Sequence, residues 1–182
     1  MIRIGIIGMG YWGPNLLRNF NSNKKFKIKY ICDINKQNLN IYSNFDNDIT
    51  TTKNYHDIIN DKTIDAVVIA TPVKTHFKIA YDALTNKKHV FVEKPLSENS
   101  LNCKKLINLA KKNKLSLFVD HTFLYTEAVI KLREISRKKD FGKIMYYDST
   151  RINLGLIQND INVLWDLAVH DLAILNYISD DI

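Results

Sequence analysis

Three residues of this chain have side chains and spacing suited to moving a proton: Lys94, Asp166 and His170. Lys94 follows a short apolar run and precedes a proline, so it should stand at the carboxyl end of a β-strand. Asp166 and His170 are four residues apart, which places both on one face of an α-helix. A carboxylate beside an imidazole suits general acid–base chemistry. The alternative is a core histidine satisfied by a neighbouring carboxylate, and Asp171 leaves open which carboxylate faces inward.

A glycine-rich loop lies upstream of these residues. Gly8, Gly10 and Gly13 have the G-x-G-x-x-G spacing, with Tyr11 and Trp12 between the last two glycines. Such a loop, placed after a strand and before a helix, makes a tight turn and lets the backbone approach a pyrophosphate. The helix N-terminus then supplies amide groups and a positive dipole. The spacing therefore predicts a dinucleotide site.

Asp33 stands 20 residues after Gly13, at the end of the next apolar run. A carboxylate there can accept hydrogen bonds from both hydroxyls of an adenosine ribose and would repel a 2′-phosphate. The sequence therefore favours NAD as the cofactor, and the nearby Lys36 leaves NADP open. Two alternatives remain: a glycine turn with a surface aspartate, and a methyltransferase, whose Rossmann-like fold also combines a glycine loop with an acidic residue.

The elements that must position these residues alternate regularly along the first two-thirds of the chain. Strands and crossover helices in alternation predict an α/β fold with a doubly wound parallel sheet, that is, a Rossmann domain. The expected strands cover 2–7, 27–32, 49–52, 66–70, 90–92 and 115–119, and the expected helices cover 11–20, 35–45, 55–60, 75–85 and 97–113. Further on, we expect a helix over 127–139, a strand over 144–151 and a helix over 161–178.

Composition excludes several classes of protein. The net charge is +7, but the lysines are spread without interleaved aromatic residues, so we expect no nucleic-acid partner. An anionic small substrate is a milder use of the same charge. No apolar run approaches the roughly 18 residues that span a bilayer, so we expect no membrane segment. Cys32 and Cys103 lie far apart without metal-type spacing, which predicts no metal site and a cytoplasmic location.

Taken in order, these motifs resemble the Gfo/Idh/MocA family of NAD(P)-dependent oxidoreductases. The resemblance runs along the whole chain, and Glu-Lys-Pro together with Asp-x-x-x-His is its most specific part. The matching elements are Gly8-x-Gly10-x-x-Gly13, Asp33, Ala70-Thr71-Pro72 with His76, Glu93-Lys94-Pro95, and Asp166-x-x-x-His170.

The resemblance implies roles for these positions. Lys94 would be the catalytic lysine that shuttles the proton of the reacting hydroxyl, and His170 would be a second acid–base or orienting group with Asp166 beside it. The implied cofactor-binding residues are Gly8, Gly10, Tyr11, Trp12, Gly13, Asp33, Thr71, Pro72, His76, Glu93 and Lys94. The implied reaction transfers a hydride between nicotinamide and a hydroxyl or keto carbon of a sugar, cyclitol or sugar nucleotide.

Two segments of the second half, 151–155 and 162–167, look most like the branch near sugar-nucleotide dehydrogenases. That likeness favours a UDP-linked N-acetylhexosamine or uronate as substrate, in polysaccharide biosynthesis. The resemblance further implies a homo-oligomer for a full-length version.

The domain organisation follows from the same comparison. We expect residues 1–121 to form the NAD(P)-binding Rossmann domain and residues 122–182 to begin a C-terminal substrate and oligomerisation domain with an antiparallel sheet. One strand and one helix do not make a second core, so we expect a truncated chain. The alternative function is a non-catalytic NAD-binding Rossmann fragment or a regulatory protein.

Overall fold

The computed structural model describes residues 1–42, 46, 48–152 and 161–179 of the 182-residue chain. The chain divides into two compact units, Met1–Val119 and Asp120–Ile182. Among the described residues, no helix is both long enough and apolar enough to cross a membrane.

The first unit is built on a parallel sheet with the strand order β3-β2-β1-β4-β5-β6. This order confirms the predicted Rossmann fold. From the centre of the sheet, β1 to β3 follow one another toward one edge and β4 to β6 toward the other, so the order of the strands changes direction between β1 and β4. Ligands of such sheets bind beyond the carboxyl ends of the strands at that switch point. The strands are β1 (Ile2–Ile7), β2 (Phe26–Cys32), β3 (Thr50–Thr52), β4 (Ala66–Ile69), β5 (His89–Glu93) and β6 (Leu117–Asp120).

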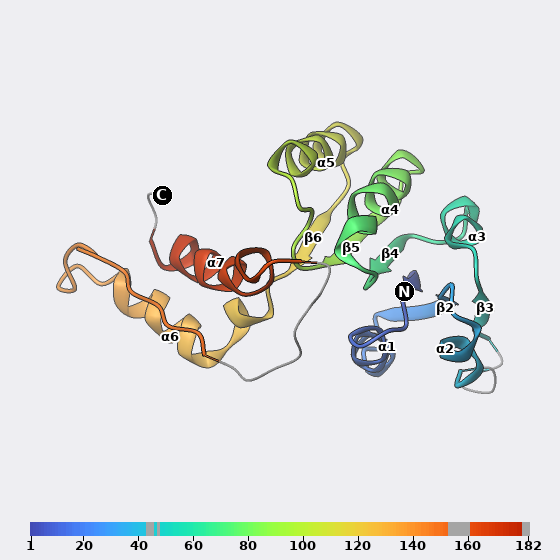
Figure 1. Ribbon diagram of the computed structural model, residues 1–182, viewed down its shortest axis with the longest axis horizontal. Coiled ribbons are helices and arrows are strands. Elements are labelled where there is room, and N and C mark those ends of the chain that lie inside the picture. Colours follow the sequence, from blue (N-terminus) through green and yellow to red (C-terminus); the bar gives the residue numbers. More distant parts are fainter. Residues whose placement is uncertain (43–45, 47, 153–160, 180–182) are drawn as a thin grey trace. The chain divides into compact units, whose positions relative to one another are not determined.

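Helices cover both faces of the sheet, as a doubly wound fold requires. Two helices, α1 (Gly13–Ser22) and α2 (Lys36–Asn40), lie on one side, and three lie on the other: α3 (Tyr55–Asn60), α4 (Val73–Thr85) and α5 (Ser100–Asn113) (Figure 1). Each layer has its own apolar cluster. Leu16 and Leu17 of α1 pack on one face of the sheet, and Leu84 of α4 and Leu106 of α5 pack on the other.

Asparagine side chains set where three of these helices begin. Asn35 accepts a hydrogen bond from the Gln37 amide, Asn54 from the His56 amide, and Asn99 from the Leu101 amide. Each bond satisfies an amide that has no partner inside the helix. The predicted start of α5 at Ser97 is therefore three residues early, since Asn99 is the cap. The helix predicted over 35–45 ends at Asn40, and residues 43–45 lie outside the described residues.

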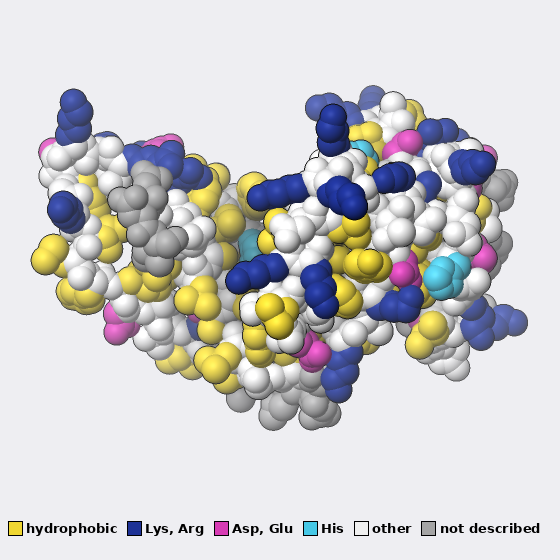
Figure 2. Space-filling model, turned by 90° about the horizontal axis from the view of Figure 1, so that it is seen from above, with side chains coloured by type: hydrophobic (Ala, Val, Ile, Leu, Met, Phe, Trp, Pro, Cys, Tyr) yellow, Lys and Arg dark blue, Asp and Glu magenta, His cyan; other side chains and the backbone are white. Residues whose placement is uncertain are grey.

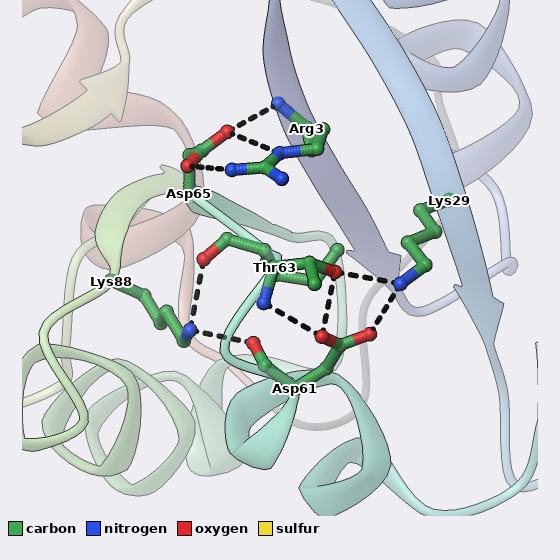
Figure 3. A network of polar contacts seen from close by, with 7 residues as sticks. Arg3, Lys29, Asp61, Thr63, Asp65 and Lys88 are labelled. Atoms are coloured by element: carbon green, nitrogen blue, oxygen red, sulfur yellow. Dashed lines mark hydrogen bonds and ion pairs between the residues drawn. The ribbon is translucent and has the colours of Figure 1, made fainter.

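A polar network ties together the amino ends of the strands (Figure 3). The Arg3 guanidinium forms two hydrogen bonds with the Asp65 carboxylate, at 3.1 and 3.0 Å. Lys88 is 5% exposed, and its ammonium donates to the carbonyl oxygens of Asp61 and Ile64, at 2.7 and 2.8 Å. These bonds hold the turn before β4 against the start of β5. The network lies at the sheet edge opposite the carboxyl ends of the strands.

The described residues of the second unit form helices and helical turns joined by irregular segments. It contains the 3₁₀ turn η1 (Thr122–Tyr125), the helix α6 (Glu127–Ser136), the π-helical turn η2 (Leu164–Ala168) and the helix α7 (Val169–Ile178). The predicted strand over 144–151 is wrong, because this segment has no regular secondary structure. A strand needs a neighbour to take its backbone hydrogen bonds, and none lies beside it in the described part of the unit. The antiparallel sheet that we expected to begin here is likewise absent from the described residues of the second unit.

Candidate functional site

The glycine loop joins the carboxyl end of β1 to the N-terminus of α1. The Gly8 amide donates to the Cys32 carbonyl of β2 at 2.8 Å, and the Ala70 amide after β4 donates to the Ile7 carbonyl at 2.8 Å. A side chain at Gly13 would overlap the Gly8 carbonyl oxygen, whereas one at Gly10 would meet no atom within 4 Å. The backbone at Gly10 is thus open to a ligand. Tyr11 and Trp12 are exposed beside it, with their rings edge to face.

Asp33 holds the glycine loop in place. One carboxylate oxygen, Oδ2, accepts hydrogen bonds from the Met9 amide at 2.7 Å and from the Asn38 side chain at 3.1 Å. The other, Oδ1, accepts from the Asn35 amide at 2.7 Å. The sequence indicated Asp33 as a ribose ligand but missed its bond to the loop. No sequence signal identifies Asn38 as a partner, because the contact depends on how α2 starts.

The turn after β4 is held by His76 of α4. Thr71 receives a hydrogen bond on its hydroxyl from Thr75, and Pro72 is the cap of the helix. The His76 ring is 1% exposed. Its Nε2 lies 2.7 Å from the Thr71 carbonyl oxygen, and its Nδ1 lies 2.9 Å from the Pro95 carbonyl oxygen. Burial lowers the pKa of His76, against the opposing effect of the two carbonyls.

Glu93 is the last residue of β5, at the same edge of the sheet, and Lys94 follows it. Glu93 is buried, and its carboxylate accepts a hydrogen bond from the Lys94 amide at 3.3 Å. Lys94 is half-buried and is joined to Pro95 by a cis peptide bond. The first unit therefore brings together at one edge the glycine loop, Asp33, the Thr71 turn and Lys94.

Asp166 and His170 belong to the second unit. Asp166 is half-buried in the π-helical turn η2, which leads directly into α7. His170 is buried in α7, with its ring edge-on to Phe123 at 4.7 Å between centroids. Asp171 has a different partner: it accepts two hydrogen bonds from the Arg151 guanidinium, at 3.1 and 2.9 Å.

Asp171 belongs to a cluster with Ser149, Arg151 and Phe123. The Arg151 guanidinium lowers the pKa of Asp171, and Ser149 donates a further hydrogen bond to the same carboxylate. Arg151 also lies over the Phe123 ring, 4.5 Å from its centroid. The sequence missed this cluster, since nothing in the spacing of Arg151 and Asp171 marks them as neighbours.

The first unit fits a bound dinucleotide. The open backbone at Gly10 and the N-terminus of α1 suit a pyrophosphate, and a carboxylate at the end of β2 suits a ribose. No group of three or more metal-ligating side chains occurs in the described part of the chain. The arrangement is that of a nucleotide-binding Rossmann domain.

Residues 2–121 match the model of the Gfo/Idh/MocA family, described as an oxidoreductase family with an NAD-binding Rossmann fold. The match covers most of the chain, and the chain belongs to this family. Its Rossmann unit is the family's NAD(P)-binding domain.

Individual relatives are distant and longer. Myo-inositol 2-dehydrogenase from Thermotoga maritima is 28% identical over 182 residues, which cover 97% of this chain and 54% of the relative. A dehydrogenase structure from Chromobacterium violaceum is 26% identical with a TM-score of 0.80, over 96% of this chain and 54% of that one. A biliverdin reductase from Synechocystis, in complex with biliverdin and NADP+, is 28% identical with a TM-score of 0.67, over 73% and 42% of the two chains. The chain therefore spans about half the length of the curated relatives that it matches.

Proposed function

We propose that this chain is the cofactor-binding part of an NAD(P)-dependent oxidoreductase that acts on a hydroxyl or keto carbon of a sugar, cyclitol or sugar nucleotide. The observation that carries the proposal is the gathering of Gly10, Asp33, Thr71 and Lys94 at one edge of the sheet. Asp33 favours NAD, because its carboxylate would repel a 2′-phosphate.

Lys94 is the proton carrier in this proposal. Its half-buried ammonium stands at the carboxyl end of β5, where ligands of such sheets bind. In the direction of oxidation, a neutral Lys94 amine takes the proton of the substrate hydroxyl while a hydride leaves the same carbon. The dinucleotide, when bound, supplies the hydride acceptor. Glu93 and Pro95 precede and follow Lys94 in the chain and fix the backbone that carries its side chain.

His170 and Asp166 are proposed to act on the substrate from the second unit. A buried imidazole can donate a hydrogen bond to a hydroxyl and keep it in one orientation for the transfer. We assign Asp166 to this role beside His170, whereas Asp171 forms an ion pair with Arg151.

The substrate class is proposed from one relative and from two segments of the second half of the chain. The relative from Thermotoga maritima is a myo-inositol 2-dehydrogenase, which supports a polyol. The likeness of 151–155 and 162–167 to sugar-nucleotide enzymes favours a UDP-linked N-acetylhexosamine or uronate, and most of the first segment lies outside the described residues. We propose the sugar nucleotide, with inositol as the first competitor to try.

The test is a titration with NADH, followed by its fluorescence. We expect saturable binding that weakens about tenfold in Asp33→Ala, since the hydrogen bonds of the carboxylate to the ribose and to the Met9 amide of the glycine loop are lost. Asp48→Ala is the matched control, because Asp48 is exposed and forms an ion pair with Lys27 on the surface. Lack of saturable binding by either NADH or NADPH would rule out the proposal.

A second candidate is a dinucleotide-binding protein without catalysis. The glycine loop and Asp33 would serve this candidate as well, since neither takes part in a chemical step. Binding of NADH with no change in nicotinamide absorbance on adding inositol, sugars or sugar nucleotides would support this candidate. Turnover that is lost in Lys94→Met would support the oxidoreductase.

A further inference from the structure

His76 connects two loops at the candidate site without reaching its surface. The residue belongs to the first half of α4, and its ring turns back toward the sheet edge. One nitrogen faces the Thr71 carbonyl at 2.7 Å and the other faces the Pro95 carbonyl at 2.9 Å, 19 residues further along the chain. Since the ring is 1% exposed, water has no access that would compete for these contacts.

Both partners of the ring are acceptors. A neutral imidazole carries one N–H, so it can donate to only one of two carbonyl oxygens at a time. Donation to both requires the charged ring, which burial opposes. A neutral ring therefore donates one hydrogen bond, to either the Thr71 or the Pro95 carbonyl oxygen, and bridges to the other turn by packing contact alone.

The two carbonyls belong to the turns that carry the candidate site. Pro95 directly follows Lys94, so a bond to its carbonyl fixes the backbone that aims the lysine. Thr71 directly follows Ala70, whose carbonyl oxygen would lie 2.5 Å from a Cβ at Gly8. The glycine loop therefore packs against the same turn that His76 holds.

We propose that His76 is a positioning residue whose imidazole bridges the turns after β4 and β5 and thereby fixes Lys94 relative to the glycine loop. It acts through Thr71 and Pro95 and touches neither cofactor nor substrate. Its consequence for catalysis rests on the proposed function, but the bridge itself is a property of this chain alone.

The first test reads the bridge in the unaltered protein. We expect NMR of ¹⁵N-labelled histidine rings to show His76 near neutral pH as a single tautomer with a slowly exchanging N–H. His56 is exposed on α3 and provides the internal reference. Rapidly averaging tautomers at His76, like those expected at His56, would overturn the proposal.

The second test reads the position of Lys94. Reductive methylation followed by mass spectrometry gives the labelling rate of Lys94 relative to Lys105, an exposed lysine of α5. We expect this ratio to rise about fivefold in His76→Phe, the effect of losing one net hydrogen bond, and to rise less in His76→Gln, which keeps one donor. His56→Phe is the matched control and should leave the ratio unchanged.

The outcomes separate this proposal from the proposed function. An equal Lys94 ratio in His76→Phe and His56→Phe overturns the bridge, whether or not NADH binds. A raised ratio in a chain that does not bind NADH supports the bridge and rejects the proposed function. If His76→Phe does not fold, the ring NMR of the unaltered protein decides.

Discussion

Gly10 and Gly13 belong to one loop, but they are glycines for different physical reasons. A Cβ at Gly13 would overlap the carbonyl oxygen of Gly8, so the absent side chain there serves the packing of α1 on β1. A Cβ at Gly10 would stand in open space. We propose that glycine at position 10 lets a ligand approach the backbone. We therefore assign Gly13 to the packing of the fold and Gly10 to ligand binding.

Substitution by alanine at these positions tests the difference. Gly13→Ala should lower the free energy of unfolding by about 1–3 kcal/mol, the usual effect of overpacking. Gly10→Ala should leave stability nearly unchanged and weaken NADH binding about tenfold, because the methyl group takes the place of a phosphate oxygen. Denaturant unfolding and NADH titration of both variants give the comparison. Equal loss of stability in the two would contradict this division of roles.

At the scale of elements, the turn before β4 depends on one buried ammonium. Lys88 donates to the Asp61 and Ile64 carbonyls, which end α3 and lead into β4. Burial lowers the pKa of Lys88, and Asp61 and Asp65 act in the opposite direction. Surface pairs of the same network, such as Arg3 with Asp65, are half exposed and stabilise the fold little. We therefore expect the buried Lys88 to stabilise the fold more than the exposed Arg3–Asp65 pair does.

Lys88→Met should lower the free energy of unfolding by about 2 kcal/mol, because two buried carbonyl oxygens lose their donor. Methionine keeps the length of the side chain, so packing changes little. Lys62→Met is the control, since Lys62 is exposed in the neighbouring turn and should cost less than about 0.5 kcal/mol. The midpoints of urea unfolding measure both. A Lys88→Met midpoint equal to that of Lys62→Met would refute the role of the buried ammonium.

The sequence predicted the elements of the first unit and the edge where the candidate site lies, because strand and helix periodicities are local properties. It did not predict the bonds of Asp33 to Met9 or of His76 to Pro95, which form only when distant turns meet. The prediction of a strand over 144–151 was wrong because a local pattern was present and a distant partner was missing. Its alternation is genuine, but a strand is stable only beside another, and sequence periodicity does not supply the neighbour.

Across the whole molecule, the two units differ in how well their backbone is protected. The first has two apolar clusters and a paired sheet. In the second, the segment 140–152 has no helix or strand, and Met145 and Tyr146 are 86% and 85% exposed. On the face drawn in Figure 2, Lys and Arg side chains are scattered among other residues and do not gather in one stripe. Exposed lysines, after which trypsin can cut, occur in both units.

Limited digestion with trypsin should consequently begin in the second unit. Lys138, Lys139 and Lys143 are exposed and lie outside helices and strands, whereas Lys105 and Lys112 belong to α5. Proteases need a backbone that can leave its hydrogen bonds, so we expect the first cuts between 138 and 143, identified by mass spectrometry. The fragment ending there should still bind NADH, because every residue proposed to hold the dinucleotide lies at or before Lys94. First cuts within α4 or α5 would show that the Rossmann unit is the less stable of the two, and loss of NADH binding on cutting at Lys143 would place part of the cofactor site in the second unit.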